Sequence, residues 1–229
     1  MQHTLLTAII GGMVPALLWL FFWLREYKDK PEPKGLIVIT FLIGMASVIF
    51  ILPLEQLARD HLNESVQLTI LWAALEEFIK YAAATVIVMK TTQIREPVDF
   101  PIYFITAALG FAALENTLFL LHPIELNDIT VSLLTGNLRF LGATLLHAVA
   151  SSFVGISLGL SFYGNWLNKR MHLIFGLLTA ITLHSIFNFF IIKDNGENFL
   201  GVFGFLWVVT IISMLLFEKL RRMKAVIPA

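Results

Sequence analysis

Six ionisable side chains interrupt otherwise apolar stretches of this sequence, and their types are those that bind metal ions, activate water and transfer protons. They are Glu76, Glu77, Lys80, Glu115, His147 and His184. An ionisable side chain at the centre of a membrane helix costs about 2.5–3.5 kcal/mol, so such residues in spans usually mark a functional site. Six of them on four stretches therefore predict one shared polar site.

The charges of these residues are compatible with a bound cation. Three carboxylates and one ammonium group leave a formal charge of about −2 if all are ionised, and one divalent ion would neutralise it. Two histidines with a carboxylate and an open coordination position suit catalytic zinc. Burial could instead leave one or two carboxyl groups protonated, in which case no metal is needed. Both interpretations stay open at this point.

Composition identifies the stretches that carry these residues as membrane spans. The 229-residue chain is 58% hydrophobic and 14% charged, with a mean hydropathy of +0.81, whereas soluble domains carry about 25% charged residues. A helix needs about 20 apolar residues to cross the hydrocarbon core. Seven such runs predict an all-α integral membrane protein, a bundle of about seven transmembrane helices near 4–24, 35–54, 66–89, 102–122, 138–163, 172–192 and 198–217.

The connections between the predicted spans are short, which predicts one polytopic membrane domain over residues 1–229, with its catalytic helices at about 66–192. Lys and Arg gather in alternate connections, around 25–34, 90–101, 164–171 and 219–224. Because cytoplasmic loops collect basic residues, the N-terminus is predicted outside and the C-terminus in the cytoplasm. Arg139, at the start of the fifth span, is interpreted as an interfacial anchor. The net charge of zero gives no reason to expect a nucleic-acid partner, and zero cysteines exclude disulfides.

This orientation also predicts the depth of the polar site. At about 1.5 Å per residue, Glu76, Glu115, His147 and His184 lie roughly 10–15 Å from the outer ends of their predicted helices. Four residues on four helices therefore fall in one layer in the outer half of the membrane. Residues at i and i+4 share a helix face, so Asn188 is expected to accompany His184.

Four short motifs resemble those of the PrsW family of intramembrane proteases. EEFIK at 76–80 resembles the family's EExxK motif, and FAALE at 111–115 resembles its FxxxE motif. HAVAS at 147–151 and HSIFN at 184–188 resemble its two later histidine motifs, so the resemblance covers about residues 70–190. It implies a multi-pass protease of the cell membrane that hydrolyses membrane-anchored proteins within the lipid bilayer. The best-known members are similar to a site-1 protease that cuts a single-span anti-sigma factor on its extracytoplasmic side.

The resemblance leads to a hypothetical role for each motif residue. Glu76, with Glu77 as second choice, is the candidate general base, and Lys80 holds the glutamates. The candidate ligands of a divalent metal, expected to be Zn²⁺, are Glu115, His147 and His184. A more distant resemblance to type II CAAX prenyl proteases implies instead that His184 and Asn188 stabilise the oxyanion, while a glutamate activates water with no metal. The sequence does not decide between these mechanisms.

A different class of function also uses Glu and His inside membranes. Proton relays and cation sites in transporters and channels rely on the same side chains. An ion- or proton-coupled transporter is therefore the alternative to the protease, beside a CAAX-like peptide-processing protease. The sequence contains no visible inverted repeat and no pair of interrupted helices, which favours the protease. It gives no indication of the oligomeric state.

Overall fold

The structure is a computed structural model of the chain, and it describes residues 2–26, 32–62, 65–92, 94–125, 142–193 and 199–223. Helices account for the secondary structure of these residues, which confirms the all-α prediction. The helices are α1 (Gln2–Glu26), α2 (Lys34–His61), α3 (Val66–Lys90), α4 (Asp99–Glu125), α6 (Thr144–Leu160), α7 (Trp166–Lys193) and α8 (Phe199–Arg222). The predicted span at 138–163 is described from residue 142 onward, so its anchor Arg139 lies outside the described residues.

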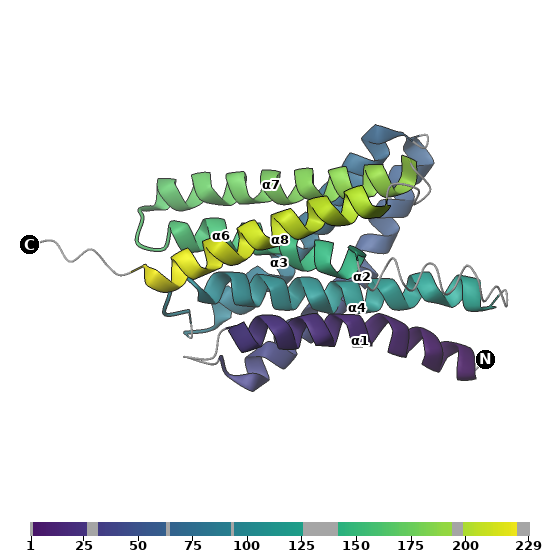
Figure 1. Cartoon of the computed structure of the whole chain (residues 1–229), viewed down its shortest axis with the longest axis horizontal. Helices are drawn as coiled ribbons and strands as arrows, with labels where there is room; N and C mark the ends of the chain where they lie inside the picture. Colours follow the sequence, from purple (N-terminus) through teal and green to yellow (C-terminus); the bar gives the residue numbers. More distant parts are fainter. Residues whose placement is uncertain are drawn as a thin grey trace, which may run out of the picture.

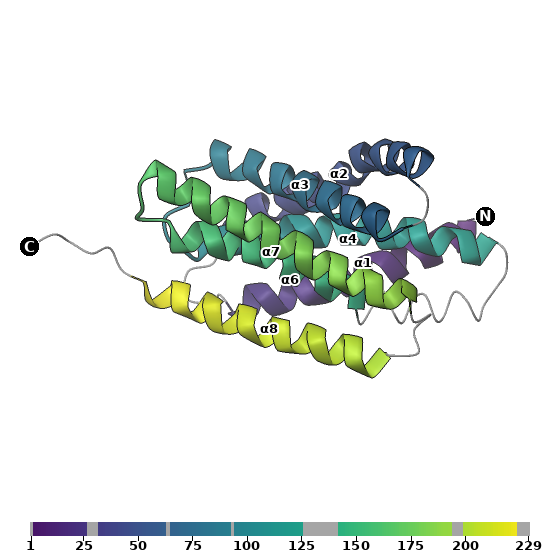
Figure 2. The ribbon, with the colours of Figure 1, turned by 90° about the horizontal axis from the view of Figure 1, so that it is seen from above.

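Most of the helices run close to one common axis and form an elongated bundle, whereas α2 crosses this axis obliquely (Figure 1). The first helix begins at the end of the bundle opposite to that where α8 ends, as an odd number of membrane crossings requires. The central helix α4 packs against α1, α2 and α6. Seen from above, α2 and α3 cover one side of this centre and α8 covers the other (Figure 2). The orientation of the bundle in the membrane stays a prediction from the basic loops.

Five of the described helices carry a stretch long and apolar enough to cross a membrane, namely α1, α2, α4, α7 and α8. Helix α3 has the necessary length, but Glu76, Glu77 and Lys80 interrupt its apolar sequence. Helix α6 is apolar and buried on almost every side over the 17 residues described for it. The chain is therefore a multi-pass membrane protein. The two helices α3 and α6, which do not reach the length and apolarity of the other five, carry Glu76, Glu77 and Lys80 (α3) and His147 (α6).

Glycines bring α4 unusually close to the helices on both of its sides. A Cβ atom on Gly44 of α2 would collide with the backbone of α4, and one on Gly110 of α4 would collide with the backbone of α2. A Cβ atom on Gly155 of α6 would meet the backbone of Pro101 in the first turn of α4. Small residues permit this approach in membrane proteins, where packing drives helix association. Helix α4 is thereby fixed between α2 and α6.

Helix α2 is longer than the sequence predicts. The predicted span ends at residue 54, next to Pro53, whereas the helix continues to His61. Proline removes one backbone hydrogen bond, but membrane helices tolerate it where neighbouring groups satisfy the freed carbonyl. The continuation adds about two helical turns and places Glu55 and Arg59 within α2.

Candidate active site

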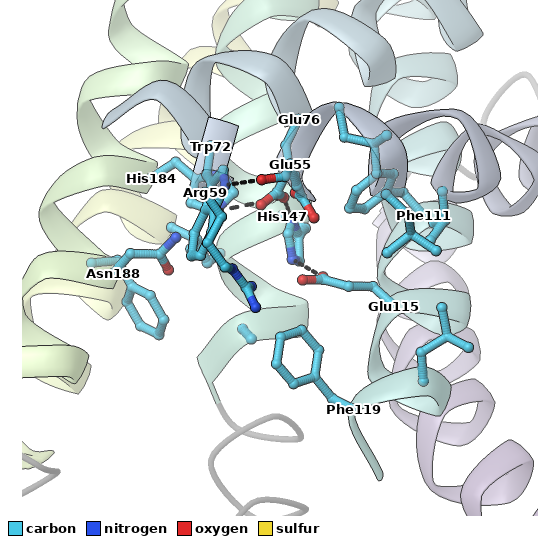
Figure 3. Close-up of a pocket in the computed structure, with 17 residues that line it drawn as sticks. Glu55, Arg59, Trp72, Glu76, Phe111, Glu115, Phe119, His147, His184 and Asn188 are labelled. Carbon is cyan, nitrogen blue, oxygen red and sulfur yellow. Dashed lines mark hydrogen bonds and ion pairs between the residues drawn. The ribbon is translucent and has the colours of Figure 1, made fainter. Parts of the chain in front are cut away.

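A cavity of about 400 Å³ lies where α2, α3, α4, α6 and α7 meet, and the predicted polar residues gather around it (Figure 3). Its lining includes Glu76 from α3, Glu115 from α4, His147 from α6, and His184 and Asn188 from α7. The depth estimate from the sequence placed four of these residues in one layer, and the structure brings their side chains together. The chemical role of each residue stays a prediction.

Glu77 is completely buried behind the cavity, where its carboxylate holds three helices together. Its Oε1 accepts a hydrogen bond from Lys80 Nζ at 2.8 Å and lies 2.9 Å from His184 Nδ1. Its Oε2 accepts a hydrogen bond from Ser151 Oγ at 3.0 Å. A carboxylate can only accept, so all three partners act as donors. Glu77 therefore positions its neighbours and does not face the cavity itself.

Lys80 is also fully buried, and its ammonium group is surrounded by acceptors. It donates to Glu76 Oε2 at 3.2 Å, to Glu77 Oε1 at 2.8 Å and to His147 Nδ1 at 2.7 Å. The ammonium also lies 4.6 Å from the centre of the Phe111 ring. These three acceptors match the three donors of an ammonium group. The association of Lys80 with the glutamates was predicted, whereas its contact with His147 spans 67 residues and could not be.

Hydrogen bonds determine which nitrogen of each histidine carries the proton. His184 donates from Nδ1 to Glu77, which leaves the lone pair on Nε2, 3.7 Å from Glu76 Oε2. His147 accepts at Nδ1 from Lys80, which leaves the proton on Nε2, 2.8 Å from Glu115 Oε2. A carboxylate that holds the far nitrogen of a histidine orients the ring and strengthens the other nitrogen as a ligand. Glu77 does this for His184.

The carboxylate that lies between the two histidines is that of Glu76. One ligand atom each from Glu76, His147 and His184 lie within 4.8 Å of one another, and all three residues are buried. Glu76 Oε2 is 3.8 Å from His147 Nδ1 and 3.7 Å from His184 Nε2. One carboxylate and two imidazoles form a donor set that catalytic zinc uses. The sequence predicted Glu115 as the carboxylate ligand beside the two histidines, whereas the geometry favours Glu76.

Three further polar or aromatic residues line the cavity and were not predicted from the sequence. These are Glu55 and Arg59 of α2 and Trp72 of α3. Trp72 Nε1 donates to the backbone oxygen of Glu55 at 3.1 Å, and the Arg59 guanidinium lies 4.9 Å from the centre of the Trp72 ring. The i, i+4 spacing of Glu55 and Arg59 indicates that they share one helix face. The predicted span ended at residue 54, however, and therefore placed both residues outside the membrane helix.

Comparison with known proteins agrees with the motifs. The sequence profile described as PrsW family intramembrane metalloprotease matches residues 32–216. Protease PrsW of Oceanobacillus iheyensis is 28% identical over 215 residues, which cover 92% of this chain and 94% of the relative. Protease PrsW of Geobacillus kaustophilus is 26% identical over 200 residues, which cover 85% of this chain and 84% of the relative. Protease PrsW of Shouchella clausii is 24% identical over 222 residues, which cover 95% of this chain and 99% of the relative. No solved structure matches the chain.

Proposed function

This chain belongs to the PrsW family and is an intramembrane protease of the cell membrane, and we propose that it cleaves single-span membrane proteins with a metal ion held by Glu76, His147 and His184. The observation that carries the proposal is the buried group of one carboxylate and two imidazoles that faces a cavity inside a multi-pass bundle. A transporter would use similar residues, but the family match favours the protease.

The donor set fits a divalent metal such as Zn²⁺ in its chemistry. Carboxylate oxygen and imidazole nitrogen are both ordinary zinc ligands, and three protein ligands leave one position for substrate or water. When bound, the ion supplies a Lewis acid that polarises a carbonyl group and acidifies water. Glu77 supports the site by fixing the ring of His184 through Nδ1.

Glu115 is then the proposed general base, the role that the sequence suggested for Glu76, and Glu76 takes the place of Glu115 as the proposed metal ligand. It lines the cavity, its side chain is 16% exposed, and its Oε2 lies 2.8 Å from His147 Nε2. A general base must reach the water that attacks the substrate, and a carboxylate at the cavity wall meets this requirement. Asn188, one turn from His184, offers an amide donor to a substrate carbonyl at the same cavity.

Lys80 competes with the metal for its ligands. Its ammonium group contacts Glu76 Oε2 and His147 Nδ1, which belong to two of the three proposed ligands. A histidine nitrogen has one lone pair, so a metal ion and the ammonium cannot both use Nδ1 of His147. The contact of Lys80 with Glu77 does not involve a proposed ligand and can persist. Lys80 therefore balances the buried carboxylates while the metal is absent.

The proposed substrate class follows from the resemblance of the motifs. A membrane-anchored anti-sigma factor, cut in the outer half of the membrane, fits a site whose residues lie roughly 10–15 Å from the predicted outer helix ends. A cavity of about 400 Å³ accommodates a few residues of an unwound segment, not a folded domain.

The experiment that tests the proposal is proteolysis by the purified protein in lipid, with a panel of epitope-tagged single-span substrates that includes anti-sigma factors. We expect wild-type protein to cleave at least one substrate, and Glu76→Gln and His184→Ala to reduce the rate at least about 100-fold. The matched control is His172→Ala, because His172 forms a hydrogen bond with the backbone oxygen of Asn168 in its own helix and does not line the cavity. Cleavage that survives both site variants would refute the proposal.

A further inference from the structure

We propose that the membrane segment of the substrate enters the cavity sideways from the lipid, through an opening between the outer halves of α2 and α4. This inference rests on the proposed function, because it concerns the substrate of the same site. We call this opening the α2–α4 entrance, and its edges are Leu52 and Arg59 of α2 and Leu118 and Phe119 of α4.

Exposure of the cavity lining locates the entrance. The lining residues that are exposed are Leu52 at 46%, Leu118 at 36%, Phe119 at 50%, and Arg59. All four belong to α2 or α4. The residues that α3, α6 and α7 contribute to the lining are buried or half-buried. The described residues therefore open the cavity to the surroundings of the bundle on one side, between two helices.

The same two helices are tightly closed on the other side of the site. The collisions expected at Gly44 and Gly110 show that their backbones touch there. Val48 and Ile51, one and two turns beyond Gly44, form a buried apolar cluster with Phe111, and all three residues line the cavity. The helices separate only beyond this cluster, and the last turns of α2 diverge from α4 in both views (Figures 1 and 2).

Proline provides a local reason for the separation. Pro53 follows the edge residue Leu52 directly and cannot donate the backbone hydrogen bond of a regular helix. Sharp changes of helix direction occur mainly at such residues. The part of α2 beyond Pro53 instead contacts α3, where Trp72 holds Glu55 and Arg59. The outer half of α2 is therefore supported by α3 and leaves the side that faces α4 open.

The chemistry of the edges indicates what passes between them. Leu52, Leu118 and Phe119 are apolar and lie on helices that cross the hydrocarbon core, so a lipid-soluble apolar segment is the matching occupant. Arg59 lies seven residues beyond Leu52, about 10 Å farther along the helix, where a spanning segment would leave the hydrocarbon. The interior of the cavity is polar at Glu76, which is where an unwound backbone would find partners.

Site-specific photo-cross-linking tests this route. The photoreactive residue p-benzoylphenylalanine replaces Leu52 or Phe119 at the entrance, and Phe175 of α7 or Val208 of α8 as exposed controls on other faces (67% and 56% exposed). The probe is a tagged single-span substrate that wild-type protein cleaves, and a Glu76→Gln background holds it uncleaved. We expect at least tenfold more cross-linked substrate at both entrance positions than at either control. Equal labelling on all faces, or stronger labelling at a control, would overturn the inference.

A second measurement closes the entrance covalently, and the chain's lack of cysteine makes it specific. Leu52→Cys and Leu118→Cys are combined and bridged with a bifunctional maleimide, and each single variant treated with the same reagent is the control. We expect bridging to reduce cleavage at least tenfold relative to both singly labelled variants. Unchanged cleavage in the bridged protein would refute the entrance while leaving the proposed function standing. Wild-type protein that cleaves no substrate would overturn both proposals.

Discussion

The buried pair of Lys80 and Glu77 should make each of these residues costly to replace alone and much less costly to replace together. Their side chains are 1% and 0% exposed, and Nζ lies 2.8 Å from Oε1. Removing one member of a buried ion pair leaves an uncompensated charge and costs about 3–5 kcal/mol. We therefore expect Glu77→Gln and Lys80→Met each to lower the free energy of unfolding by about 3 kcal/mol or more, a factor of about 150 in the equilibrium constant.

The double variant should recover part of this loss, because neither charge of this pair then stays buried without the other, although Glu76 and His147 still lose their contacts with Lys80. Interaction energies between contacting buried residues reach about 3 kcal/mol, so we expect the double variant to be about 2–3 kcal/mol more stable than the sum of the single effects. The single and double variants are compared by reversible unfolding in lipid bicelles. The control is Glu218→Gln, because the pair of Glu218 and Arg222 is exposed and should contribute nothing measurable. Strictly additive effects would refute the coupling.

Three further changes have defined outcomes. Ser151→Ala removes a hydrogen bond to the buried carboxylate of Glu77 and should cost about 1.5–3 kcal/mol in the same unfolding assay; an unchanged stability would contradict the contact. Gly44→Ala forces a Cβ atom against the α4 backbone and should cost about 1–3 kcal/mol, whereas Gly204→Ala, with open space around it, should be neutral or stabilising. Burial raises the pKa of Glu32, in the connection before α2, from 4.5 to about 7, so the folded state binds this proton more tightly and loses stability as pH rises through that interval. Glu32→Gln should flatten this part of the stability profile, and a profile identical to that of wild type would contradict it.

The helices and the convergence of the site could be predicted because both follow from one-dimensional patterns. Only helices and closed β-barrels satisfy every backbone group in a membrane, and apolar runs of about 20 residues have the length of a spanning helix, not of a strand. The common depth of Glu76, Glu115, His147 and His184 follows from counting residues along those helices. The described bounds agree with this counting within a few residues at most helix ends.

Side-chain geometry between helices could not be predicted in the same way. Glu76 is favoured over Glu115 as the carboxylate ligand because it lies between the rings of His147 and His184. No residue spacing within one helix determines which carboxylate takes that position. The length of α2 was wrong because hydropathy falls after Pro53, while contacts with α3 carry the helix onward to His61. The entrance depends on where two helices diverge, which is a property of tertiary packing.

The measurement that tests the central claim most directly combines zinc content with cleavage in wild type, Glu76→Gln and Glu115→Gln. Each protein is purified, stripped with chelator, reloaded with Zn²⁺ and analysed for metal by mass spectrometry beside its proteolytic rate. We predict about one ion per wild-type chain, at least about tenfold less in Glu76→Gln, and a full ion with a rate about 100-fold or more below wild type in Glu115→Gln. Full cleavage by metal-free wild type, or loss of the ion in Glu115→Gln but not in Glu76→Gln, would contradict the account.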